Sequence, residues 1–205
     1  MNPNPFSDTI TFLVQPALTT AIFWVLLAAS AASAVYVYRM IPGQRSVENV
    51  GNWAFRLLIG CMWWQQSLWK LPPDYTGLTY WMGLMGKHAA IPLQADFVNQ
   101  IVLPHVYLFA PVVYAAEVLT AVSLILGLFV RFWALVGAAQ ILNLWLGLYS
   151  APGEWPWTYF FLLILMLVFA LHRYGRSLGL DAIIFGRTIS QPNDGRLRRA
   201  LAVVT

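Results

Sequence analysis

The chain has little charge and almost no cysteine. Only 10% of its 205 residues are Asp, Glu, Lys or Arg, against about 25% in an ordinary soluble domain. The single cysteine, Cys61, excludes an intrachain disulfide and a cysteine metal cluster. The sequence also lacks a glycine-rich phosphate-binding loop, any sign of a serine or cysteine nucleophile, and a convincing internal repeat. These absences argue against a soluble nucleotide-dependent enzyme and against a disulfide-stabilised domain.

Long apolar runs are what the sequence has instead, since 60% of its residues are hydrophobic. Five runs approach the roughly 20 residues that a membrane-crossing helix needs. Lipid offers backbone polar groups no partner outside a helix or a closed barrel, and runs such as LLILMLVFAL do not alternate as barrel strands do. We therefore predict an all-α integral membrane protein with five transmembrane helices, at roughly residues 17–38, 51–71, 106–130, 132–150 and 155–172. The first would be an N-terminal addition to an antiparallel four-helix core.

The first run contains ASAASA, which resembles a signal-peptide cleavage site. However, residues 1–16 contain no Lys or Arg, and the run is about as long as a full membrane helix, so a signal peptide fits poorly. We expect this run to remain in the protein as a membrane helix.

The basic residues are distributed unevenly between the predicted helix ends. All ten arginines fall at one set of ends, whereas the two lysines, Lys70 and Lys87, fall at the other. Because positive charge concentrates on the cytoplasmic side, we predict an external N-terminus and a cytoplasmic C-terminus, and no nucleic-acid partner. The predicted organisation is an N-terminal segment (1–45), a membrane domain (46–187) and a basic cytoplasmic tail (188–205).

Residues 72–104 separate the second and third apolar runs and are half apolar. Their two apolar pieces are too short or too polar to cross a membrane. They are typical of segments that lie at the external interface, either as a loop resting on lipid headgroups or as a lid over a site.

Several polar side chains fall within the apolar runs. At 100° per residue, Arg56, Ser67 and Lys70 share one stripe of the second run. Aromatic-belt and snorkelling preferences account for the Trp and Lys residues there, but Gln65 and Gln66 lie about a turn deeper and should need protein partners.

Glu117 lies near the middle of the third run, where a carboxylate costs about 2.5–3.5 kcal/mol to insert. Gln140 and Asn143 lie in the fourth run. Arg56 should lie about two turns closer to the cytoplasm than Glu117, so a direct ion pair between them is not expected. These polar residues indicate either a hydrogen-bonded cluster that locks the helices or a proton-linked, quinone-type pocket. The three histidines fall at interfaces on different sides, which argues against a b-type haem.

Three motifs in order resemble the DoxX/DoxD membrane family. They are RLLIG with the later LWKL in the second run, AEVLTAVSLILGLFVRF at 116–132, and HRYGRSLGLDAIIFG after the last run. The resemblance covers roughly residues 50–187 and touches Arg56, Lys70, Glu117 and Arg131. The DoxD branch is the large membrane subunit of thiosulfate:quinone oxidoreductase, and other relatives are membrane partners in redox complexes. The resemblance implies a subunit near quinone chemistry in a bacterial or archaeal cytoplasmic membrane.

We therefore expect a membrane subunit of a quinone-linked redox complex, with no redox centre, haem or metal cluster of its own. The alternative is a non-catalytic subunit that anchors a larger respiratory or photosynthetic complex. In the first interpretation Glu117 and Arg56 are predicted as catalytic residues, with Glu117 relaying a proton. Apolar walls and a few hydrogen-bond donors suit a quinone, and its predicted ligands near the outer interface are Trp63, Gln65, Gln66, Trp69, Lys70 and Asn143.

Overall fold

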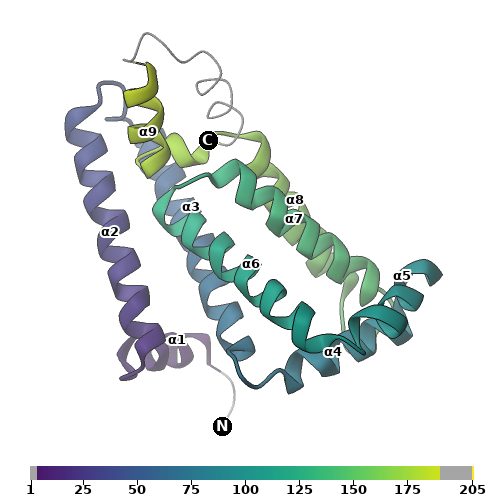
Figure 1. The fold of residues 1–205 in the computed structure, drawn as a ribbon. Helices are drawn as coiled ribbons and strands as arrows, with labels where there is room; N and C mark the ends of the chain where they lie inside the picture. The colour runs from purple at the N-terminus through teal and green to yellow at the C-terminus, as the bar shows by residue number, and fades with distance from the viewer. Residues whose placement is uncertain (1–3, 190–204) are drawn as a thin grey trace.

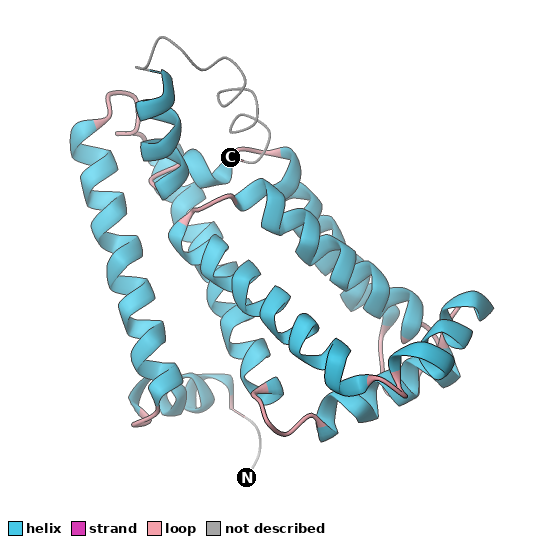
Figure 2. Ribbon diagram, in the orientation of Figure 1, coloured by secondary structure: helices cyan, strands magenta, loops and turns pink. Residues whose placement is uncertain are grey.

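A computed structural model describes residues 4–189 and Thr205, and within them the chain is helical with no strand. Figure 2 shows this all-helical architecture. The elements are α1 (Pro5–Val14), α2 (Leu18–Met40), α3 (Val47–Ser67), η1 (Leu68–Lys70), α4 (Thr76–His88), α5 (Pro92–Phe97), η2 (Val98–Val102), α6 (Val106–Leu126), α7 (Val130–Gly147), α8 (Pro156–Leu171), η3 (Tyr174–Arg176) and α9 (Leu180–Ile189). The predicted basic tail lies almost entirely outside the described residues.

Four long helices form the body of the molecule in chain order (Figure 1). α3 packs along α6, α6 along α7, and α7 along α8, each pair running antiparallel. α2 lies beside α6 at the edge of this group. The arrangement is the one expected from the sequence, an antiparallel four-helix core with one added N-terminal helix. The short helix α1, which the sequence analysis did not predict, folds against the start of α2.

The structure supports membrane insertion without confirming five crossings. Three of the described helices, α2, α6 and α7, are long and apolar enough to cross a membrane. α8 is strongly apolar but has only 16 residues, which makes it about 24 Å long against a hydrocarbon core of roughly 30 Å. α3 has 21 residues, but Glu48, Arg56 and its two glutamines lower its hydropathy. The exact number of crossings therefore stays a prediction.

A tight turn joins α6 to α7. Gly127 ends α6 in the left-handed conformation, at φ +69°, which glycine adopts without a steric penalty. Its N–H and that of Leu128 both donate to the carbonyl of Ser123, whose hydroxyl in turn donates to the carbonyl of Leu128. This network places the end of α6 beside the start of α7 and so aligns the two helices, which carry Glu117 and Gln140 near their middles.

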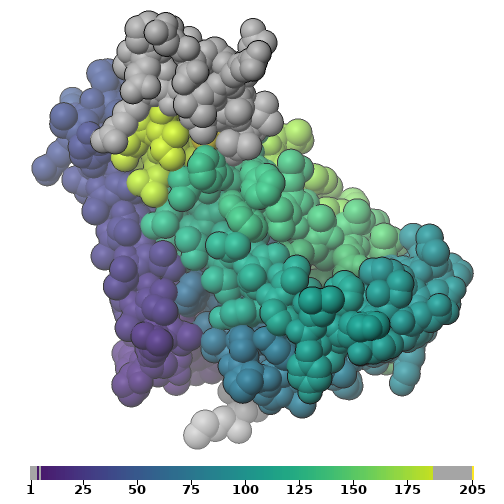
Figure 3. Space-filling model, viewed as in Figure 1, coloured from purple at the N-terminus to yellow at the C-terminus, as the bar shows by residue number. Residues whose placement is uncertain are grey.

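The two ends of the bundle are built differently, and they are named the inner end, which carries α9, and the outer end, which carries α4 and α5; these names mark ends of the molecule and not sides of the membrane. α9 and η3 lie at the end where α6 turns into α7, whereas α1, α4 and α5 lie at the opposite end (Figure 1). Residues 76–102 form the three helical pieces α4, α5 and η2, which lie across the outer ends of the core helices. Figure 3 shows these pieces covering the lower right of the molecule. The segment predicted as either a loop or a lid is thus an ordered helical cap.

Candidate functional site

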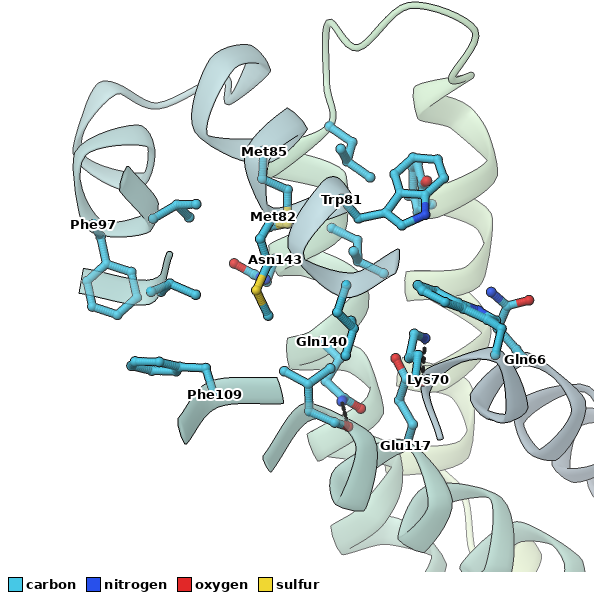
Figure 4. A pocket seen from close by; sticks show the side chains of 18 residues that line it. Gln66, Lys70, Trp81, Met82, Met85, Phe97, Phe109, Glu117, Gln140 and Asn143 are labelled. Atoms are coloured by element: carbon cyan, nitrogen blue, oxygen red, sulfur yellow. Dashed lines mark hydrogen bonds and ion pairs between the residues drawn. The ribbon is translucent and has the colours of Figure 1, made fainter. Parts of the chain in front are cut away.

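A cavity of about 500 Å³ lies beneath the helical cap. Its walls come from the end of α3 and η1, from the cap, and from the outer halves of α6, α7 and α8. The volume falls within the usual range for small-molecule sites, roughly 300–1,000 Å³. It is lined by Gln66, Trp69, Lys70, Leu78, Trp81, Met82, Met85, Phe97, Val98, Val102, Phe109, Val113, Glu117, Gln140, Asn143, Leu144, Leu148 and Tyr159 (Figure 4).

A buried ion pair forms part of the cavity wall. The ammonium of Lys70 donates to Oε2 of Glu117 at 2.5 Å, and only 7% of each side chain is exposed. Lys70 also lies 4.5 Å from the centre of a Trp69 ring, a cation–π distance. Charged groups this deeply buried are stable only when they are paired. The pair therefore fixes a cation and a carboxylate at one end of a mostly apolar cavity.

The local fold of α3 explains how Lys70 reaches Glu117. The helix ends at Ser67 and tightens into η1, where the N–H of Leu71 donates to the carbonyl of Leu68. Arg56, Ser67 and Lys70, which share one stripe of α3, are all buried. Lys70 thus turns inward toward α6 instead of extending outward to the lipid–water interface.

Two amides on α7 provide further polar groups. Nε2 of Gln140 donates to the carbonyl of Val113 at 3.3 Å, which joins α7 to α6. Asn143 accepts two bonds of 2.9 Å from Nε2 of Gln94 in the cap, one at its carbonyl and one at Oδ1. The first amide lies beside the ion pair in Figure 4, and the second holds the cap against the bundle.

The remainder of the cavity is apolar and adaptable. Met82 and Met85 are buried on α4, while Phe97 and Phe109 pack edge to face on one side of the cavity, with ring centres 6.3 Å apart. Methionine side chains fill irregular spaces and accept ligands of different shapes. The cavity therefore has a polar end at Lys70, Glu117 and Gln140, and an apolar end under the cap.

The structure brings together five of the predicted site residues. Gln66, Trp69, Lys70, Glu117 and Asn143 all line the cavity. Their assignment as ligand-binding or catalytic residues stays a prediction, but the structure shows that they lie around one cavity. Sequence reasoning had also recognised Gln140 as intramembrane without placing it among the ligands.

Trp63 and Gln65 do not line the cavity. Trp63 packs into the bundle core, where its ring lies 3.3 Å from the position that a Cβ on Gly137 would occupy. The expectation that Gln65 and Gln66 need protein partners is wrong, because both side chains are exposed and neither forms a hydrogen bond to another described residue. Both lie in the last turn of α3, about one turn before Lys70, as the sequence predicts.

Arg56 lies in a different cluster at the inner end of the bundle. It is fully buried and donates to the backbone carbonyls of Leu124 and Ile125, where α6 ends. Asp181 of α9 accepts from the N–H groups of Phe129 and Val130, where α7 begins, at 2.8 and 3.3 Å. A cation at a helix C-terminus and an anion at a helix N-terminus both interact favourably with the helix dipole. The expected lack of an Arg56–Glu117 pair agrees with this geometry, which indicates a structural role for Arg56.

The sequence analysis left open that residues 72–104 form a lid over a site, but it named none of their side chains among the site residues. Trp81, Met82, Met85 and Phe97 supply much of the apolar wall. Their signal was present, since residues 76–97 combine aromatic and methionine side chains with too little length to cross a membrane. Among the described residues, no group of three or more His, Cys, Asp or Glu side chains is placed to bind a metal ion.

Comparison with known proteins identifies the family to which the residues around this cavity belong. The DoxX family model matches residues 51–150, which run from α3 through the cap and α6 to the end of α7. No curated protein and no solved structure matches the chain. The matched segment includes both partners of the buried ion pair and nearly all of the cavity lining. Residues 51–150 therefore form a DoxX domain, and the chain is a DoxX-like membrane protein.

Proposed function

We propose that the chain is a membrane subunit of a quinone-linked redox complex and that the cavity beneath its cap binds the quinone ring. The observation that carries this proposal is the buried Lys70–Glu117 pair in the wall of a cavity whose other lining residues are mostly aromatic, methionine and aliphatic, with three amides among them. A quinone ring is flat and apolar with acceptor oxygens at its ends. Apolar walls with a few fixed polar groups are what such a ligand requires.

The residues of the polar end have separable roles in this proposal. Lys70 uses one N–H for Glu117 and has others with which to donate to a quinone carbonyl. Glu117 holds the ammonium in place, because its carboxylate is the partner that makes a buried lysine stable. Trp69 and Trp81 provide ring faces for stacking at the mouth of this end.

A bound quinone would supply two-electron, two-proton redox chemistry. The electrons would come from a partner subunit, and the chain's own contribution would be to bind and orient the ring. Its resemblance to the DoxD branch favours a partner that oxidises a sulfur compound, as in thiosulfate:quinone oxidoreductase. The distribution of arginine and lysine favours a cytoplasmic-membrane orientation with the cavity near the outer surface.

Photoaffinity labelling tests the proposed ligand site. The purified full chain, in lipid nanodiscs, would be irradiated with an azido-benzoquinone, and labelled peptides would be mapped by mass spectrometry. We expect labels concentrated within residues 66–70, 81–85, 109–117 and 140–148, with competition by excess unlabelled quinone. Labels spread over the lipid-facing surface of α2 without competition would contradict quinone binding and favour a purely anchoring subunit, which needs no such cavity.

A further inference from the structure

The amide of Gln140 has one atom that the described part of the chain leaves unpaired. Its Nε2 donates to the carbonyl of Val113, whereas its Oε1 is buried and has no hydrogen-bond partner among residues 4–189 and Thr205. Gln140 lines the cavity, and Figure 4 places its amide beside Lys70 and Glu117. A buried acceptor without a partner loses its bonds to water and gains nothing in return. The polar end of the cavity therefore has an acceptor that a ligand can satisfy.

The orientation of this amide is determined by its neighbour. A backbone carbonyl only accepts, so the group facing Val113 must be the NH₂ and not the oxygen. Exchanging the two ends would place two acceptors against each other and would leave two N–H donors without a fixed partner on the cavity side. The acceptor character of the cavity side of Gln140 thus follows from the chemistry of Val113 and not from an arbitrary choice of amide rotamer.

We infer that the cavity binds the reduced, dihydroxy form of the ring, the hydroquinone, more tightly than the oxidised quinone; this inference rests on the proposed function. A hydroquinone hydroxyl donates to Oε1 of Gln140 and accepts from the ammonium of Lys70 with the same oxygen. A quinone carbonyl accepts from Lys70 but has no hydrogen for Gln140. It leaves the buried Oε1 unpaired and brings a second acceptor toward it.

Such a preference raises the reduction potential of the bound quinone. A ligand form that binds more tightly is stabilised, so tighter binding of the hydroquinone makes the bound quinone a better electron acceptor. For a two-electron couple, each tenfold difference in affinity raises the reduction potential by about 30 mV. The inferred role of Gln140 is consequently to favour electron transfer from the partner subunit to the bound quinone.

The binding test uses the full chain in nanodiscs under anaerobic conditions. Isothermal titration calorimetry would compare a short-tailed benzoquinone with its hydroquinone. We expect the hydroquinone to bind about tenfold more tightly, the effect of pairing one buried acceptor. A redox titration of the bound couple should independently show a potential about 30 mV above that of the free couple in nanodiscs.

A matched pair of variants assigns the preference to Gln140. Gln140→Met keeps the length of the side chain and removes the acceptor, so the affinity difference should disappear. Gln65→Met makes the same change on an exposed side chain outside the cavity and should retain it. Equal or tighter binding of quinone by the unmodified chain overturns the inference, as does a preference that persists in Gln140→Met. If neither ring form binds the unmodified chain, the proposed function itself is wrong and the inference falls with it.

Discussion

At the scale of single residues, the Lys70–Glu117 pair combines stability and recognition in one contact. Both side chains are almost fully buried, and each is the charged partner of the other. A buried ion pair is costly to break, because the remaining charge has neither water nor a counterion. Both side chains also line the cavity, so a ligand that enters it can contact the pair.

A double-mutant cycle on this pair should show strong coupling. Lys70→Met or Glu117→Leu alone should lower the free energy of unfolding by about 3–5 kcal/mol, because each leaves one buried charge unpaired. The double variant should recover most of that loss, since two apolar side chains of similar size replace the pair. Unfolding by SDS titration in mixed micelles would measure all three. Additive losses in the double variant would show that the two charges do not stabilise each other.

Asp181 predicts a pH dependence at the inner end of the molecule. Burial raises the pKa of this carboxyl from 3.8 to about 6, although the N–H groups of Phe129 and Val130 and the positive charge of Arg56 oppose the shift. Between about pH 4 and pH 6 the folded chain therefore holds a proton that the unfolded chain has released. Stability from this group is present below pH 4 and is lost as pH rises to 6.

The loss should be at most about 3 kcal/mol, the equivalent of two pKa units. Unfolding measured between pH 4 and pH 7 should show it in the native chain. Asp181→Asn, which does not titrate, should lack this component while keeping acceptor and donor groups near Phe129. An identical pH profile in the variant would assign the dependence to other groups.

At the residue level, periodicity placed Arg56, Ser67 and Lys70 on one stripe of α3, and the structure buries all three. The burial of Lys70 was not predicted, since snorkelling to the interface was the expectation for that side chain. The partner of Glu117 was not predictable in the same way. Lys70 reaches it only because α3 ends at Ser67 and tightens into η1, and helix ends are poorly determined by an apolar run.

At the scale of helices, close contact between α3 and α6 positions the cavity walls. A Cβ added at Gly60 would lie 2.9 Å from the backbone nitrogen of Ile125 and 3.0 Å from Cβ of Leu124. Only glycine allows the two backbones to approach so closely. Gly60 lies one turn after Arg56, which donates to the carbonyls of the same two residues, so this crossing holds α3 against the end of α6.

Gly60→Ala should therefore destabilise the bundle by about 1–3 kcal/mol through overpacking. Gly51→Ala provides the matched control on the same helix, because its added Cβ would meet no atom within 4 Å. The stability of the Gly51→Ala control should equal that of the native chain or exceed it by up to about 1 kcal/mol, because alanine has a higher helix propensity than glycine. Thermal unfolding in detergent would compare the two. Equal stability of both variants would mean that α3 and α6 can move apart at Gly60 without loss of stability.

The helices were predictable and the cap was not. The long helices begin and end close to the predicted ranges because each apolar run is punctuated by glycine, proline or charged residues. The cap pieces α4, α5 and η2 are short, and their apolar residues suit either a lipid surface or a cavity wall. Only their contacts with the bundle, such as Gln94 with Asn143, decide between these environments.

At the scale of the whole molecule, the charge distribution predicts the orientation in the membrane. Lys70 and Lys87 lie at the capped end, and Arg39, Arg131 and Arg176 lie toward the end that carries α9. The arginine-rich end should be cytoplasmic. This assignment places the cavity near the external surface, on the same side as α1.

Cysteine labelling would test that orientation in a Cys61→Ala background. Asp8→Cys and Lys87→Cys should react with a membrane-impermeant maleimide on whole cells. Glu48→Cys, at the start of α3, should react only after permeabilisation. All three native positions are exposed, so accessibility depends on sidedness and not on burial. Labelling of position 48 together with position 8 on whole cells would rule out the proposed topology.

The central claim is that the cavity at the Lys70–Glu117 pair binds a quinone. The most direct test is equilibrium binding of a radiolabelled quinone to the full chain in nanodiscs, counted per chain. We predict one saturable site in the native chain and in Lys87→Met, whose exposed lysine lies outside the cavity. The folded double variant Lys70→Met/Glu117→Leu should lose at least about tenfold in affinity, because charged hydrogen bonds contribute roughly 1.5–3 kcal/mol each. Unchanged saturable binding in the double variant, or none in the native chain, would contradict the account.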